Sequence, residues 1–234
     1  MEPKEKYVHE VFQKLADGYD GANTRISAGM HMRWKKAAVA DLAAHLGEKP
    51  KVLDMCCGTG DMLRLIHAER PGAKLTGIDF SANMLKVAKD RCRDIPDLQL
   101  MDGNVRQLPM ADNTFDAITM SFALRNTADY AGVLKEALRV LKPGGCFLCI
   151  DSFVPESRLV RPFYRFYFSC VMPVLGGGIR KRKQYLWLNQ STKLFLSVRQ
   201  LEKLMEQTGY ERVRHREFML GACGCVTGIK KENT

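Results

Sequence analysis

The chain contains no uninterrupted run of 18 apolar residues, and its first residues, Met1 to Lys6, are mostly charged and have no apolar stretch behind them. A helix that spans a bilayer needs about 20 apolar residues, and a secretory signal peptide needs an apolar segment near the start of the chain. Neither kind of segment is indicated. We therefore expect a cytoplasmic protein and leave association with a membrane surface open.

Cysteine patterns typical of disulfides or zinc sites are weak. The eight cysteines lie mostly inside apolar segments of a 234-residue chain, which is long enough to form a core without disulfides. We expect reduced thiols. The spacing Cys146-x-x-Cys149 invites a zinc site, but it falls in an expected strand, where residues three apart point to opposite faces. No metal is predicted.

The charge balance is basic, with 36 Lys and Arg against 26 Asp and Glu and a formal net charge of +10. Such an excess favours an anionic partner, which could be nucleic acid, anionic lipid or an acidic substrate. The chain has no Asn-Pro-Pro-Tyr-type base-flipping motif and no basic aromatic strand, so we expect no nucleic-acid partner. The densest basic run, residues 180–183, is either a solvated loop or a contact with anionic lipid.

Hydrophobic residues make up 46% of the chain, and short apolar runs alternate with helical patterns between residues 51 and 151. This alternation is typical of a parallel sheet flanked by helices. Strands are expected at 51–55, 74–79, 97–101, 114–121 and 145–151, and a helix at 128–141 is expected to stop at Pro143-Gly144-Gly145. A helix at 197–208 and an antiparallel pair at 211–217 and 222–230 complete a Rossmann-like, doubly wound α/β sheet of seven strands.

The remaining segments are expected to cover the site of a single domain. Residues 1–50 form an amino-terminal helical cap, with Tyr19-Asp20 in a turn and His31 at the start of its second helix. Residues 51–151 form the cofactor-binding core, residues 152–196 form a helical insertion that acts as a lid, and residues 197–234 form the terminal helix and strands. No repeat or low-complexity linker separates these parts.

A glycine-rich turn after the first strand is followed by a second strand that ends in an acidic residue. Gly58 and Gly60 let the backbone approach a ligand, and Asp79, about 20 residues further on, can accept both ribose hydroxyl protons. A dinucleotide site needs a third glycine, but Leu63 holds that position, and Asp61 would repel a diphosphate at the helix entrance. The motif therefore indicates a nucleoside ligand without a diphosphate.

A ligand with an ammonium and a sulfonium would be favoured by Asp54 and Asp61, while its carboxylate could take the N–H groups of the turn. S-adenosylmethionine has this charge pattern. Because ligands of doubly wound sheets bind outside the carboxyl ends of the strands, we predict these cofactor-binding residues: Asp54, Gly58, Thr59, Gly60, Asp61, Asp79, Phe80, Met84, Asn104, Val105 and Ser121. A core role is equally plausible for Phe80 and Met84, and loop capping is the alternative for Asn104 and Ser121.

At these positions the chain resembles a known family, the class I methyltransferases that C-methylate demethylmenaquinol and the ubiquinone precursors. The resemblance covers nearly the whole chain and rests on Ser27-x-Gly29-x-His31-x-x-Trp34, Cys57-Gly58-Thr59-Gly60-Asp61, Asp79-Phe80-Ser81, Ser121-Phe122-Ala123-Leu124-Arg125-Asn126 and Arg139-Val140-Leu141-Lys142-Pro143-Gly144-Gly145. It implies that Thr59, Asp79, Asn104-Val105 and Ser121 contact S-adenosylmethionine, and that Arg125 and Asn126 face the quinol.

The chain departs from the family pattern on the acceptor side. Ala123 stands where the family usually has glycine, and Asn189 and Leu196 take the places of prolines. These departures leave two alternatives beside quinol methylation. One is a methyltransferase for another small acceptor, such as a sterol, a sugar or a polyketide, and the other is a cofactor- and lipid-binding module without turnover. The presence of Arg125 and Asn126 argues against the module.

Methylation of a hydroquinone ring carbon requires that one ring hydroxyl, with a pKa of roughly 10, loses its proton. We expect Arg125 to stabilise the oxyanion with its fork of donors and Asn126 to orient it, with water or Tyr19 carrying the proton. These three residues and His31 are the predicted catalytic residues. His31 is the only histidine with a suitable position for a base, and it is the weakest candidate because a histidine at a helix start is more often structural.

The insertion is strongly apolar and aromatic, with Phe163, Tyr164, Phe166, Tyr167, Phe168, Val171, Met172, Val174 and Leu175. It either packs as a helix on the core or forms a lid and channel for a polyprenyl tail. In the second case Arg158, Arg161, Arg165 and residues 180–183 would touch anionic head groups. The expected partners are thus a prenylated quinol or another small aromatic acceptor and an anionic membrane surface, and a homodimer is left open.

Overall fold

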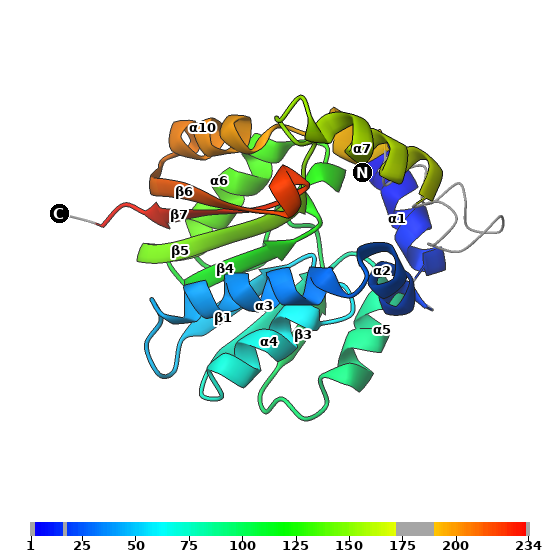
Figure 1. Ribbon diagram of the computed structural model, residues 1–234. Coiled ribbons are helices and arrows are strands. Elements are labelled where there is room, and N and C mark those ends of the chain that lie inside the picture. Colours follow the sequence, from blue (N-terminus) through cyan, green and yellow to red (C-terminus); the bar gives the residue numbers. More distant parts are fainter. Residues whose placement is uncertain (1–2, 16–17, 172–189, 233–234) are drawn as a thin grey trace.

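The computed structural model describes residues 3–15, 18–171 and 190–232. Within these ranges seven strands form one sheet in the order β3-β2-β1-β4-β5-β7-β6 (Figure 1). The strands are β1 (Lys51–Met55), β2 (Lys74–Asp79), β3 (Gln99–Asp102), β4 (Phe115–Ser121), β5 (Leu141–Ser152), β6 (Tyr210–Phe218) and β7 (Cys223–Lys230). The first five run parallel, and β7 pairs antiparallel with both β5 and β6.

Successive apolar residues of each central strand point to opposite faces, so the sheet has a core on each side. On β1, Val52 joins one core and Leu53 the other, and on β5 Leu148 and Phe147 divide in the same way. Helices α3 (Met30–Ala43) and α4 (Asp61–Glu69) cover the face of Val52. Helices α6 (Tyr130–Val140) and α10 (Val198–Thr208) cover the face of Leu53. The parallel strands are therefore buried on both faces, as their nearly continuous apolar sequences require.

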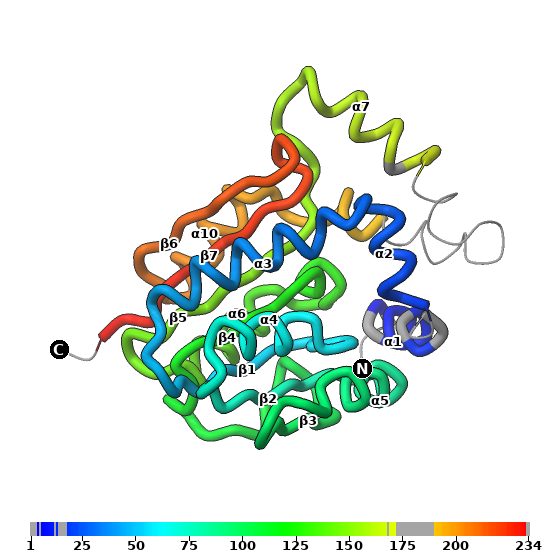
Figure 2. The backbone as a smooth tube through the Cα atoms, turned by 60° about the horizontal axis from the view of Figure 1, so that its bottom comes forward, coloured from blue at the N-terminus to red at the C-terminus, as the bar shows by residue number. Residues whose placement is uncertain are grey.

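Helices α1 (Pro3–Leu15), α2 (Tyr19–Ser27) and α7 (Val160–Phe166) gather beyond the ends of the strands, at the edge toward which the parallel strands point (Figures 1 and 2). Lys4 fastens α1 there, because its Nζ donates to the carbonyl oxygens of Arg125 at 3.0 Å and Thr127 at 2.6 Å. The Tyr167 hydroxyl, in the π-helix η2 (Tyr167–Val171) that follows α7, donates to the carbonyl oxygen of Ile26 in α2. The amino-terminal helices and the insertion thus meet over the carboxyl ends of the strands.

The predicted elements agree with the observed ones within a few residues, with two exceptions. Strand β5 begins at Leu141 rather than at residue 145, because Leu141 already pairs with Phe115 before the ladder shifts register. Tyr19 begins α2 and does not lie in a turn, since Gly18, in the left-handed conformation with φ 85°, makes the turn before it. The described part of residues 1–50 therefore contains three helices, and His31 is the second residue of the third, which begins at Met30. No helix in the described part of the chain is long and apolar enough to cross a bilayer.

Candidate active site

Two loops at the carboxyl ends of the strands hold unusual backbone conformations. Cys56, after β1, and Phe122, after β4, adopt positive φ angles of 57° and 54°, and Gly58 and Gly60 follow Cys56 with φ 54° and 86°. A residue other than glycine in this region costs on the order of 1 kcal/mol and persists where the surroundings impose it, most often at ligand sites. Cys56, Gly58 and Phe122 all line one cavity.

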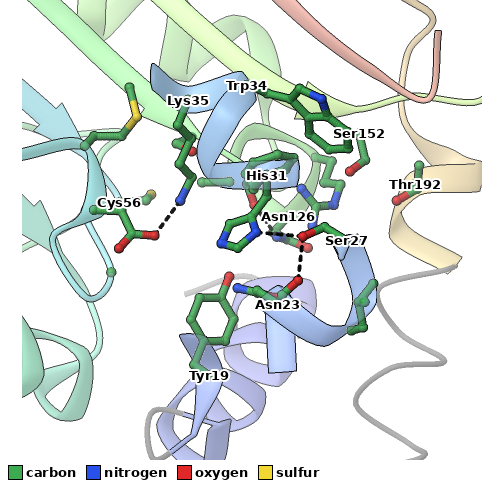
Figure 3. Close-up of a pocket in the computed structure, with 18 of the residues that line it drawn as sticks. Tyr19, Asn23, Ser27, His31, Trp34, Lys35, Cys56, Asn126, Ser152 and Thr192 are labelled. Carbon is green, nitrogen blue, oxygen red and sulfur yellow. Dashed lines mark hydrogen bonds and ion pairs between the residues drawn. The ribbon is translucent and has the colours of Figure 1, made fainter. Parts of the chain in front are cut away.

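This cavity has a volume of about 760 Å³. Its walls come from α2, α3 and α7, from the loops after β1, β2, β3 and β4, and from the 3-10 turn η4 (Met219–Gly221). All four predicted catalytic residues line it, and Figure 3 shows three of them, Tyr19, His31 and Asn126, around it. The predicted cofactor residues that line it are Asp54, Gly58, Thr59, Asp61, Asp79, Phe80, Met84, Asn104, Val105 and Ser121.

Gly60 is the one predicted cofactor residue that is absent from the cavity wall. It lies at the start of α4, and a Cβ atom at this position would be 2.6 Å from the Cys92 Sγ at the end of α5 (Ala82–Arg91). The missing side chain therefore lets α4 approach α5 closely. The structure gives Gly60 a packing role, where the sequence predicted a ligand contact.

Asp79 joins the end of β2 to the glycine turn. Its Oδ2 accepts the N–H of Gly58 at 2.9 Å, and its Oδ1 accepts the N–H of Ser81 at 2.9 Å. Burial raises the pKa of the Asp79 carboxyl, while these hydrogen bonds oppose the shift. Each carboxylate oxygen has a second lone pair, so Asp79 can still accept from a ligand's hydroxyls.

Asp54, which lines the cavity, has one unsatisfied carboxylate oxygen. Its Oδ1 accepts the Thr119 hydroxyl at 2.7 Å, whereas its Oδ2 is buried and has no hydrogen-bond partner among the described residues. Burial raises the pKa of the carboxyl to about 7. A buried polar atom without a partner is unusual, and a cationic group on a ligand would satisfy it.

The prediction that Asp61 stands ready for a cationic ligand is not supported by its contacts. Its Oδ2 pairs with the Lys35 Nζ at 2.9 Å and its Oδ1 with Arg91 at 2.7 Å. Although burial disfavours the charge, these two cations hold the pKa of Asp61 below its usual value. Since the charge of Asp61 is already balanced, Asp54 is the better partner for an ammonium.

Asp20 extends this ionic network to the helix that covers the turn. Its Oδ1 accepts the Thr59 hydroxyl at 2.8 Å, and its Oδ2 pairs with Arg91 at 2.7 Å. Arg91 also donates to the Thr59 Oγ at 2.8 Å. Sequence reasoning missed Lys35 and Arg91 and gave Asp20 no role, because no local pattern marks ion pairs between helices that are distant in the sequence.

The other predicted cofactor residues show a mixture of roles. The Asn104 Oδ1 accepts a backbone N–H two residues on, at 2.9 Å, which is the predicted alternative of loop capping. Met84 is almost fully buried, and the Phe80 ring lies 5.1 Å from the His9 ring of α1. The Ser121 Oγ is buried and has no partner among the described residues, so it remains available to a ligand.

Arg125 and Asn126 form a buried wall of the cavity in the 3-10 turn η1 (Leu124–Asn126). The Arg125 guanidinium pairs through Nη1 with Asp151, which is fully buried, and the Arg125 backbone N–H donates to the same carboxylate at 3.2 Å. The Asn126 Oδ1 is buried without a partner in the described part of the chain. Asp151 was not predicted, although its place near the carboxyl end of β5 is the signal that identified Asp54 and Asp79.

The aromatic residues of the insertion divide between the inside and the outside. Tyr164 is buried and lines the cavity, whereas the Phe163 and Phe166 side chains are 78% and 64% exposed although they also line it. Residues 172–189, which include the basic run and the predicted Met172, Val174 and Leu175, lie outside the described residues.

The chain matches the model of the ubiE/COQ5 methyltransferase family over residues 1–230. It is 40% identical over 232 residues to the demethylmenaquinone methyltransferase of Lysinibacillus sphaericus, with 97% of each chain covered. It is 41% identical over 230 residues to that of Staphylococcus aureus (strain JH9), with 97% of this chain and 95% of the relative covered.

Solved structures show the same fold. A SAM-dependent methyltransferase of Thermotoga maritima is similar with a TM-score of 0.65 at 20% identity, covering 95% of this chain and 99% of its own. The phosphoethanolamine N-methyltransferase 2 of Haemonchus contortus, in complex with S-adenosyl-L-methionine, is similar with a TM-score of 0.62 at 16% identity, covering 84% of this chain and 52% of its own.

The strand order and the acidic strand ends around one cavity define a class I S-adenosylmethionine-dependent methyltransferase. The chain belongs to the ubiE/COQ5 methyltransferase family, and S-adenosylmethionine is its cofactor. The predicted fold, family, enzyme class and cofactor are thereby confirmed, which sets aside the module without turnover. The roles of the individual site residues stay predictions.

Proposed function

We propose that the enzyme methylates a ring carbon of a reduced prenylated quinone of the demethylmenaquinol type, as a step in respiratory quinone biosynthesis. Relatives with that activity in their names share about 40% identity over nearly the whole chain. The structural observation that carries the proposal is a single cavity lined both by the acidic strand ends and by apolar residues of α7, Val160, Phe163 and Tyr164. An apolar wall of this kind suits a ring with a hydrocarbon tail better than a polar acceptor.

When bound, S-adenosylmethionine supplies an electrophilic methyl group on a sulfonium. The Asp54 Oδ2 would hold its ammonium, Asp79 its ribose hydroxyls, and the N–H groups of the glycine turn its carboxylate. This assignment is supported by the buried Asp54 Oδ2 and Ser121 Oγ, which have no partners among the described residues and belong to residues of the cavity wall.

On the acceptor side, Arg125 and Asn126 would hold the hydroxyl oxygen of the quinol as it loses its proton. Asp151 keeps the guanidinium in one orientation, and a preorganised cation in a buried wall stabilises an oxyanion more than a solvated one does. The unpartnered Asn126 Oδ1 would accept the remaining hydroxyl. Tyr19, the first residue of α2, lines the same cavity and would pass the proton toward solvent.

We further propose that α7 lies on an anionic membrane surface and that the polyprenyl tail leaves the cavity beside it. Leu159, Phe163 and Phe166 are exposed and are spaced as residues on one face of a helix. Arg158 and Arg165, also exposed, flank this apolar face. An apolar face with basic neighbours is typical of helices that bind at the lipid interface.

Another small acceptor remains a second candidate because of the residue before η1. Ala123 lines the cavity, so its methyl group occupies space that glycine would leave open. Leu196, the other described departure, packs against the apolar core, and Asn189 lies outside the described residues. If the acceptor differs from that of the relatives, Ala123 is the position where the described structure would change specificity.

Turnover with a panel of acceptors tests the function. The purified protein with S-adenosylmethionine should methylate a chemically reduced demethylmenaquinone, detected by a mass increase of one methylene on the ring, and should leave a sterol and a sugar unchanged. The Ala123→Gly variant is the matched probe of specificity and should prefer the same quinol. Cofactor binding without turnover on any quinol, or a better rate with a non-quinol acceptor, contradicts the proposal.

Liposome flotation tests the membrane contact. Arg158→Ser combined with Arg165→Ser should reduce flotation with anionic vesicles, because each basic residue near such a surface contributes roughly 1 kcal/mol. Lys89→Ser combined with Arg93→Ser removes the same charge from exposed positions at α5 and should float like the wild type. Equal loss in both variants would mean that net charge, and not α7, directs the binding.

A further inference from the structure

The hydrogen bonds around His31 favour a proton on one of its two ring nitrogens. The Ser27 Oγ lies 2.8 Å from the carbonyl oxygen of Asn23 and 2.7 Å from the His31 Nδ1 (Figure 3). A carbonyl oxygen only accepts, so the Ser27 hydroxyl proton is directed to Asn23. In this arrangement the Ser27 oxygen accepts from His31, with a proton on Nδ1 and a lone pair on Nε2.

The Nε2 side of the ring faces the cavity. Figure 3 shows the imidazole turned away from Ser27 toward the space between Tyr19 and Cys56. His31 is 7% exposed, and the hydrogen bond that its ring makes to a described residue, Ser27, uses Nδ1 and not Nε2. The ring is thus part of the cavity wall, and its Nε2 points into the cavity.

Burial is the main cause that favours the neutral form of the imidazole. Burial and the positive charge of Lys35 lower the pKa of His31 from its ordinary value of 6.5, and the carboxylates Asp61 and Asp20 only partly oppose this shift. Among the other groups of the cavity wall, Asp54 and Asp79 are buried acids with raised pKa values, and Arg125 is paired with Asp151. A neutral histidine with a free Nε2 is the form that accepts a proton.

We propose that His31 is the base that removes the ring proton after methylation, and that Ser27 is the positioning residue that holds its tautomer. The inference rests on the proposed function. The ring carbon that has gained the methyl group still carries its hydrogen. The C–H bond breaks, its electron pair returns to the ring and restores aromaticity, and the proton passes to the His31 Nε2. The imidazolium then releases this proton to solvent.

The tautomer can be observed directly and without turnover. Nitrogen NMR of the wild type with S-adenosylhomocysteine bound should show a protonated Nδ1 and an unprotonated Nε2 for His31 at neutral pH. Ser27→Thr keeps the hydroxyl and should keep this pattern, whereas Ser27→Ala should allow the other tautomer to appear. A proton on Nε2 in the wild type would overturn the proposal.

The kinetic test uses His31→Asn, because the asparagine amide replaces Nδ1 as the donor to Ser27 but has no counterpart of Nε2. With a demethylated quinol that the wild type turns over, kcat should fall about 100-fold, the lower end of what a general base contributes, while S-adenosylhomocysteine affinity stays within about twofold. With the acceptor deuterated at the methylated carbon, the variant should show a primary isotope effect that the wild type lacks, because proton loss has become rate-limiting.

The results separate the inference from the function on which it rests. A wild type that turns over no quinol contradicts the proposed function itself. If the wild type is active and His31→Asn is equally fast, or is slower without an isotope effect, His31 is not the base. The proposed function is then unaffected. A fall of the wild-type kcat at low pH is a further expected result, since protonation of the His31 Nε2 removes the lone pair that takes up the ring proton. This fall should be absent in His31→Asn.

Discussion

Cofactor affinity should rise with pH near neutrality because of Asp54. Burial raises the pKa of the Asp54 carboxyl to about 7. In the folded protein the protonated carboxyl therefore dominates below about pH 7. The stability that this form contributes to the folded protein is lost as the pH rises through this pKa. A cofactor ammonium beside Oδ2 would pair with the ionised carboxylate and so offset the unfavourable free energy of ionising this buried group. With this pKa, roughly one tenth of the protein is ionised at about pH 6 and about half at about pH 7, so the Kd should fall about fivefold between them.

Titration calorimetry with S-adenosylhomocysteine, in buffers of different ionisation enthalpy, measures both the affinity and the proton released on binding. Asp54→Asn keeps the acceptor for the Thr119 hydroxyl but cannot ionise, and it should bind about 2 kcal/mol more weakly with no dependence on pH. Asp97→Asn makes the same change at an exposed site and should behave like the wild type. A wild-type Kd that is constant over this range, or the same pH dependence in Asp54→Asn, would refute the reasoning.

Three further predictions follow from individual contacts. Gly60→Ala should lower stability by about 1–3 kcal/mol in thermal unfolding, because its Cβ would meet the Cys92 Sγ, and Cys92→Ala in the same chain should recover part of the loss. Arg125→Lys keeps a cation beside Asp151 and should retain the affinity for S-adenosylhomocysteine. Its kcat should fall about tenfold to a hundredfold, since a point charge cannot replace the guanidinium fork. An unchanged kcat would mean that Arg125 takes no part in the chemistry. Asp79→Asn should weaken S-adenosylhomocysteine binding by about 2–3 kcal/mol in calorimetry, and unchanged affinity would place the ribose elsewhere.

Much of the fold could be predicted because its signals are local. The apolar runs that became β1, β2 and β4 are short and bounded by polar or turn residues, and the alternation of Val52 and Leu53 between two cores is a consequence of strand geometry alone. The same holds for Asp54 and Asp79, since a residue at the carboxyl end of a parallel strand lies at the ligand edge whatever surrounds it.

The partners of the charged and polar side chains depended on the tertiary structure. Whether Asp61 faces a ligand or an ion pair is decided by Lys35, 26 residues away, and by Arg91, 30 residues away, which packing brings within 2.9 and 2.7 Å of it. Arg125 could be identified as a site residue from its motif, but its pairing with Asp151 arises from the contact between η1 and β5.

The sequence by itself therefore determined the class of protein and predicted the edge of the sheet where the cavity lies, because strand periodicity and the glycine turn act over a few residues. Only the tertiary structure decided which buried carboxylate oxygen is left without a hydrogen-bond partner among the described residues, which aromatic residues of the insertion are exposed, and that His31 lines the cavity. Those properties follow from burial and from charges on other segments of the chain, which the local sequence does not predict.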